Sequence, residues 1–176
     1  MKNSYYYLIA SLPMLHFGMK PLFFYPDFLE ACSSELNQDD MGILVNLSIE
    51  PSMDIEDKLP LLKEWKSFNR GLGNELVRTR AAKKGKDPNK YLRGNEGLDP
   101  FIAPLAHWAV NQDSPAEAEL YLDRARWEKI EEIKTGHYFD IEYLAAYGLQ
   151  LKILERWHRI NSGEGVKVLE GLAGKL

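Results

Sequence analysis

The stretch SPAEAELYLDRARWEKIEEIKTGHYFDIEYLAAYGLQLKILERWHRI, residues 114–160, decides the fold. Ser114 is a helix cap, Pro115 suits the first helical position, and Glu117 completes a capping box. Apolar residues then recur at helical spacing. The sequence therefore predicts a first long helix that runs to about Thr135.

A second long helix follows after a short break. Gly136 and His137 interrupt the pattern, and helical spacing resumes from about Asp140 to Ile160. A short turn between two long helices predicts an antiparallel helical hairpin. The apolar members of the two helices are Leu120, Leu122, Ala125, Trp127, Ile130 and Ile133 in the first, and Ile141, Leu144, Ala145, Gly148, Leu151, Leu154 and Trp157 in the second.

Upstream, the pattern from Ile55 to about Lys84 is also strongly helical. Gly71 and Gly73 weaken this helix by about 1 kcal/mol each relative to Ala, so they mark a bend or a close contact with a neighbour. The Gly- and Pro-rich residues 85–100 predict a loop. A further helix is expected over residues 101–110.

The first fifty residues give shorter signals. Residues 5–12 fit either a buried strand or a helix, because a short apolar run does not separate the two. Pro26 and Asp27 open a helix, and Asn37 is a plausible cap for another. Near the end of the chain, residues 164–172 predict a short last helix.

The expected fold class is all-α: a bundle of antiparallel helices with a C-terminal helical hairpin. With 176 residues, we expect one helical domain over 1–176, with sub-lobes 1–95 and 96–176 as an alternative division. Cys32 is the only cysteine, which excludes an internal disulfide and fits a reducing compartment. We expect a cytoplasmic protein, because no apolar run is long enough to span a bilayer.

Catalytic signatures are missing. The chain has no GxSxG elbow and no P-loop, and Cys32 lacks recognisable catalytic surroundings. Glu132, His137 and Asp140 could meet at the hairpin turn and bind a metal, but their spacing crosses a break. Capping of the preceding helix by His137 is the plainer interpretation. We therefore expect no enzyme activity, no metal and no cofactor.

One local stretch is strongly basic although the net charge of the chain is −4. Only Asp87 opposes its cations, and such a stretch attracts phosphate or an acidic partner surface. The alternative is a solvated helix end, since Lys and Arg favour the last helical turn. The candidate partner-binding residues are Arg78, Arg80, Lys83, Lys84, Lys86, Lys90 and Arg93. Trp65, Trp127 and Trp157 are either interface anchors or core residues.

Four strings carry a resemblance to a known family: YYYLIASLP at 5–13, FNRGLGNELVRTRAAKKGKDPNKYLRG at 68–94, SPAEAELYLDRARWEKIEEI at 114–133 and HYFDIEYLAAYGLQLKILERW at 137–157. They resemble a small bacterial family of uncharacterised proteins whose genes lie within V-type (A/V-type) ATPase operons. The resemblance covers nearly the whole chain, and its motifs are non-catalytic.

The resemblance implies a non-catalytic component or accessory of a bacterial V-type ATPase. Its partners would be other ATPase subunits, and it would lie at the inner face of the cell membrane without spanning it. The family looks like a shortened counterpart of the helical, funnel-like adaptor that seats the central shaft on the membrane rotor. The chain is short for a complete three-lobed funnel, and peripheral-stalk or assembly roles stay open. A phosphate- or RNA-binding regulator that uses the basic stretch is the alternative.

Overall fold

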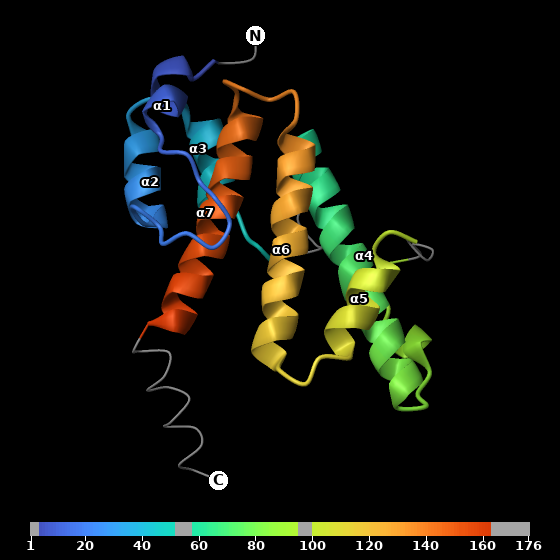
Figure 1. Ribbon diagram of the computed structural model, residues 1–176. Coiled ribbons are helices and arrows are strands. Elements are labelled where there is room, and N and C mark those ends of the chain that lie inside the picture. The colour runs from blue at the N-terminus through green and yellow to red at the C-terminus, as the bar shows by residue number, and fades with distance from the viewer. Residues whose placement is uncertain (1–3, 52–57, 95–99, 163–176) are drawn as a thin grey trace. The chain divides into compact units, whose positions relative to one another are not determined.

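A computed structural model describes residues 4–51, 58–94 and 100–162 (Figure 1). Over these residues the chain is all-helical, as the sequence predicted. The α-helices are α1 (Tyr6–Ser11), α2 (Tyr25–Ser33), α3 (Gln38–Val45), α4 (Pro60–Lys83), α5 (Ala103–Val110), α6 (Pro115–Lys134) and α7 (Ile141–Asn161), and a 3-10 turn, η1, spans Pro88–Lys90.

The capping predictions are confirmed at three helices. The Ser114 hydroxyl accepts a hydrogen bond from the Glu117 amide (3.3 Å) at the start of α6. The Asp140 carboxylate accepts one from the Tyr143 amide (3.0 Å) at the start of α7. The Asn37 amide oxygen does the same for Asp40 at α3 (2.9 Å). These caps fix where the helices begin because they satisfy amides that have no partner in the first turn.

Other expectations had to be narrowed. Residues 5–12 form the short helix α1 rather than a strand. The described part of the helix expected from Ile55 begins at Pro60, because residues 52–57 lie outside the described range. The last helix expected over residues 164–172 also lies outside it.

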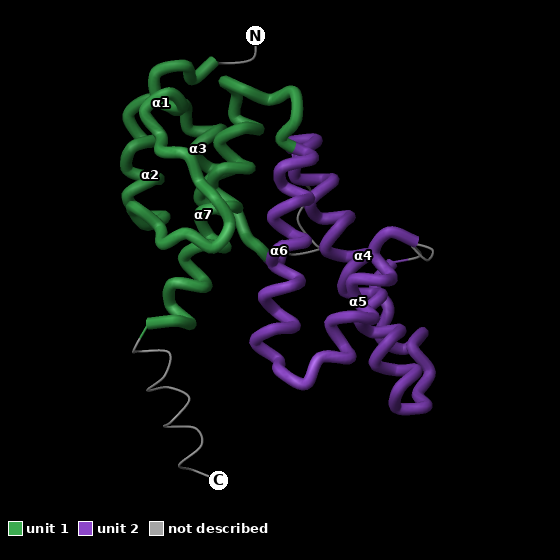
Figure 2. Tube along the Cα trace, in the orientation of Figure 1, with its two compact units in different colours: residues 1–49, 134–176 green, residues 50–133 purple. Residues whose placement is uncertain are grey.

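The chain divides into two compact units, shown in Figure 2. Unit 1 comprises residues 1–49 and 134–176, and unit 2 comprises residues 50–133. The expected sub-lobe boundary near residue 95 thus falls inside unit 2. Helices α6 and α7 were both predicted correctly, but they fall mainly in different units. Their packing as an antiparallel hairpin stays a prediction.

In unit 1, helices α2 and α3 pack against α7. Gly148 marks the closest approach: a Cβ atom there would lie 3.0 Å from Leu47 and 3.3 Å from Phe28 and Tyr25. Two tyrosine hydroxyls donate to backbone carbonyls in this core, Tyr25 to Leu44 (2.6 Å) and Tyr147 to Pro13 (2.9 Å). The hydroxyls therefore satisfy carbonyls where the chain leaves its helices.

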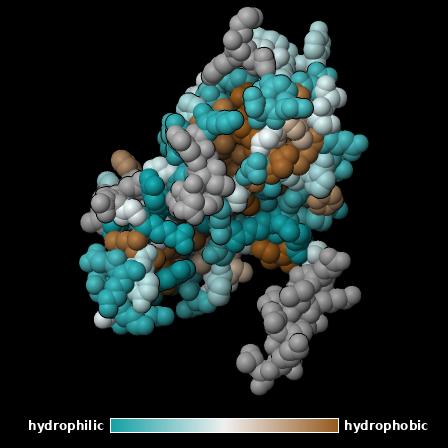
Figure 3. Space-filling view, turned by 180° about the vertical axis from the view of Figure 1, so that it is seen from behind, coloured by the Kyte–Doolittle hydropathy of each residue, from teal (hydrophilic) through white to brown (hydrophobic). Residues whose placement is uncertain are grey.

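In unit 2, α4, α5 and α6 share an apolar core. A Cβ atom at Gly71 would lie 3.1 Å from Ile102, so this glycine marks a close contact between α4 and α5, as the sequence suggested. Gly73 has open space beside it. The face in Figure 3 is mainly hydrophilic, with apolar side chains confined to smaller areas. The core residues are Leu72, Ile102, Ala109 and Leu122, with Phe68, Leu76, Leu105 and Ala118 packed around them.

No helix within the described ranges is both long and apolar enough to cross a membrane.

Candidate interaction surface

The basic stretch lies at the C-terminal end of α4 and in the segment that follows it. Arg78 is half-buried, whereas the other six cationic residues are exposed. We call these six the basic surface; it consists of Arg80, Lys83, Lys84, Lys86, Lys90 and Arg93. The segment does not leave the helix, because η1 contacts α4.

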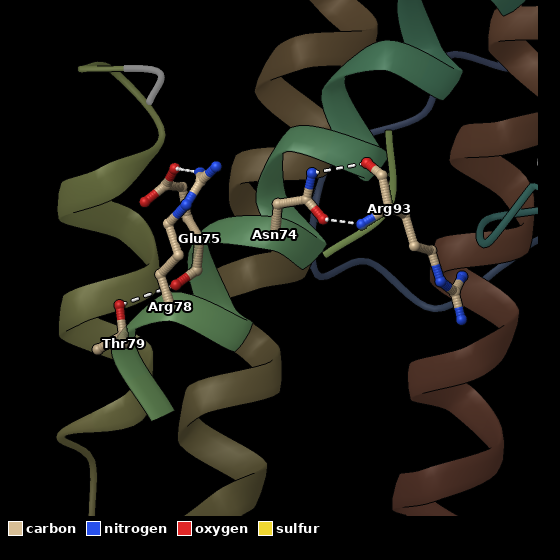
Figure 4. Close-up of polar contacts among 5 residues, drawn as sticks. All are labelled: Asn74, Glu75, Arg78, Thr79 and Arg93. Carbon is tan, nitrogen blue, oxygen red and sulfur yellow. Dashed lines mark hydrogen bonds and ion pairs between the residues drawn. The ribbon is translucent and has the colours of Figure 1, made fainter. Parts of the chain in front are cut away.

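A side chain of α4 fixes the returning segment. Asn74 is buried, and its amide nitrogen donates to the Arg93 carbonyl (2.9 Å). The Arg93 amide donates in turn to the Asn74 oxygen (2.9 Å). Figure 4 shows both bonds, with the Arg93 side chain extending away from Asn74. This two-bond clasp returns the chain to α4 nineteen positions after Asn74, and the cations between lie on one folded-back segment.

Arg78 has a different environment. Its guanidinium forms an ion pair with Glu75, one helical turn earlier, whose side chain is nearly fully buried (Figure 4). The Thr79 hydroxyl donates to the Glu75 carbonyl (2.9 Å) on the same helix. Arg78 therefore neutralises a buried carboxylate, and its positive charge is less available to a partner than those of the exposed cations.

Two further contacts organise the basic surface. The Lys83 ammonium donates to the Val110 carbonyl (2.9 Å) and so caps the C-terminal end of α5. The Asp87 carboxylate accepts from the Asn89 amide (3.0 Å) and caps η1. The single acidic residue of the stretch thus has a structural role. The surface presents fixed positive charge, which suits recognition of an acidic partner and supplies no nucleophile.

The tryptophans are not the exposed anchors that one interpretation of the sequence suggested. Trp65 and Trp127 are buried, and Trp157 is half-buried. Exposed aromatic residues gather instead in unit 1. Tyr6 and Phe139 contact each other with ring centroids 4.5 Å apart, and Tyr7 and Tyr138 are exposed. The tyrosine run at 5–7 was the signal, but its short apolar context favoured burial.

The residues weighed for a metal site are divided between the units. Glu132 pairs with Lys129 in unit 2 (2.8 Å). His137 and Asp140 lie together in unit 1, with Nδ1 and Oδ2 2.8 Å apart. The His137 backbone amide donates to the Lys134 carbonyl (3.0 Å), so the preceding helix is closed by the backbone of His137. Its imidazole faces α7.

Cys32 is fully buried in unit 1, and burial raises the pKa of its thiol to about 12. A thiol with such a pKa is protonated near neutral pH and is a poor nucleophile. Cys32 is therefore a core residue.

Comparison with known proteins finds one family model. Residues 108–176 match a family described as protein of unknown function (DUF2764). The match covers less than half of the chain, namely the end of α5, all of α6 and α7, and the C-terminal segment. No curated protein and no solved structure matches the chain.

Proposed function

We propose that this protein is a non-catalytic component of a bacterial V-type ATPase. Its role would be that of a central-stalk adaptor, which links the soluble sector to the membrane rotor. The family resemblance of four strings along the chain supports this proposal. Two of those strings, 114–133 and 137–157, lie within the part that is similar to DUF2764.

The basic surface is the observation that carries the docking part of the proposal. Its cations are exposed, and the clasp between Asn74 and Arg93 holds the segment that bears them. A held segment loses less conformational entropy on binding than a free one. Its partner would be an acidic surface elsewhere in the ATPase. Attachment through partners would place the protein at the inner face of the cell membrane without a span of its own.

A pull-down at graded salt concentration tests this docking. The tagged chain is mixed with the solubilised ATPase, and retained subunits are identified by mass spectrometry. We expect retention at low salt that weakens as salt screens the charges. The triple variant K84E/K86E/K90E should lose it. The matched control K20E/K58E/K63E reverses three exposed lysines elsewhere and should retain it.

Two results would contradict the proposal. One is equal retention by both triple variants, which would mean that the basic surface is not used. The other is failure of the wild-type chain to retain any part of the ATPase at low salt. Binding of RNA in a parallel salt titration, with a slope of several released counterions, would favour the regulator alternative instead.

A further inference from the structure

Three metal-ligating side chains gather where the chain enters α7. Gly136 adopts a positive φ of 92° and turns the chain after α6. His137 follows this turn, Asp140 caps α7, and Glu142 stands in its first turn. One ligand atom from each of the three residues lies within 4.8 Å of the others. All three belong to unit 1.

The imidazole lies between the two carboxylates. Its Nδ1 is 2.8 Å from Asp140 Oδ2, and its Nε2 is 3.2 Å from Glu142 Oε2. The other Asp140 oxygen, Oδ1, accepts from the Tyr143 amide (3.0 Å) and so holds the carboxylate in place. A short stretch of sequence thus supplies both nitrogen and oxygen donors.

The electrostatics of this cluster favour a cation. The Glu142 side chain is only 3% exposed, and that of Asp140 is 18% exposed. Beside a neutral imidazole, two carboxylates leave about two negative charges in a site with little water, which is unfavourable. A proton on the imidazole compensates one of these charges. A divalent ion compensates both.

We propose that His137, Asp140 and Glu142 bind a divalent transition-metal ion of the zinc class. One imidazole nitrogen with two carboxylate oxygens is a donor set that Zn²⁺ accepts. The Nε2–Oε2 separation of 3.2 Å is close to the about 3.4 Å between neighbouring ligands of a tetrahedral zinc ion. Rotation of the imidazole about its Cβ–Cγ bond brings the same nitrogen toward Asp140, and water completes the coordination.

This inference does not depend on the ATPase proposal, because a local metal site would form with or without the partner. It also changes the expectation from sequence alone. Glu142 replaces Glu132 as the second carboxylate, and the break between the helices brings the ligands together instead of separating them.

Calorimetric titration of the chelator-treated, full-length chain with Zn²⁺ tests the site. We expect one ion per chain. The variants H137Q and E142Q should each weaken binding by about tenfold or more. D140N should also weaken it while the helix cap survives, because Asn caps as well as Asp. H16Q removes an exposed histidine of the same unit and should bind as the wild type does.

A spectroscopic readout separates ligation from a structural effect. The ring nitrogens of His137 should shift in a ¹H–¹⁵N spectrum when Zn²⁺ is added, whereas those of His16 should not. Circular dichroism checks that each variant is folded, and D140N keeps the test decisive if E142Q unfolds. No zinc uptake by the wild type, or equal affinity in H137Q and D140N to that of the wild type, would overturn the proposal.

Discussion

Asp123 and Arg126 form an ion pair inside unit 2, with Oδ1 and Nη1 2.6 Å apart on successive turns of α6. Both residues are buried. The Arg126 Nε also donates to Asn69 of α4 (3.4 Å), so the pair connects two helices. Loss of one partner would leave the other charge buried with weaker compensation.

The substitution D123N should therefore lower the free energy of unfolding by about 3 kcal/mol, because it removes the charge that Arg126 faces. Urea unfolding followed by circular dichroism measures this change. The control D113N alters an exposed aspartate and should stay within about 0.5 kcal/mol of the wild type. Equal stability of D123N and D113N would show that the buried pair contributes little.

Gly148 should be intolerant of a larger side chain. G148A places a Cβ atom 3.0 Å from Leu47, and such overpacking costs about 1–3 kcal/mol. The matched control is G42A in α3 of the same unit, where nothing lies within 4 Å. Ala is the better helix former, so G42A should raise stability by about 0.5–1 kcal/mol. Thermal melts of both variants give the two signs.

The sequence predicted the long helices well because their ends are set by local chemistry. Ser114 and Asp140 cap α6 and α7 through bonds to amides three residues on, which a sequence pattern reveals directly. The tyrosine run at 5–7 stayed undecided because six helical residues are too few for periodicity to show. Burial of α7 was also underestimated: every residue from 144 to 151 is buried, not a single stripe.

The candidate sites were predictable only in part. The cations of the basic surface are visible in the sequence, but the clasp is not, because Asn74 reaches Arg93 across nineteen positions. Glu142 resembles an ordinary surface carboxylate in a first helical turn, yet its side chain is 3% exposed. Burial of such a group depends on tertiary packing, which a periodic pattern does not encode.

The clasp should stabilise the folded-back segment. N74A removes both hydrogen bonds and leaves the backbone groups of Arg93 without that partner, which costs about 1–3 kcal/mol. Amide hydrogen exchange should become faster between residues 84 and 94, while exchange in α7 stays slow. N46A, which removes the bond of an exposed asparagine to Gly42, is the control. Unchanged exchange in N74A would contradict the clasp.

Stability should fall in alkali, in part through Cys32. Burial raises the pKa of the folded thiol from 9.0 to about 12. The unfolded thiol therefore loses its proton first, and the contribution is complete below pH 9 and is lost as pH rises toward 12. The slope reaches at most about 1.4 kcal/mol per pH unit for one group. Urea unfolding at stepped pH should show a shallower decline in C32A; equal slopes would exclude this role.

The central claim is that the protein is a component of a V-type ATPase, and purification of that ATPase from native membranes tests it most directly. The complex is isolated under conditions that retain the stalk subunits, and its chains are identified and quantified by mass spectrometry. We predict that this chain is present in a fixed ratio to the stalk subunits. Its absence from intact complexes would contradict the claim.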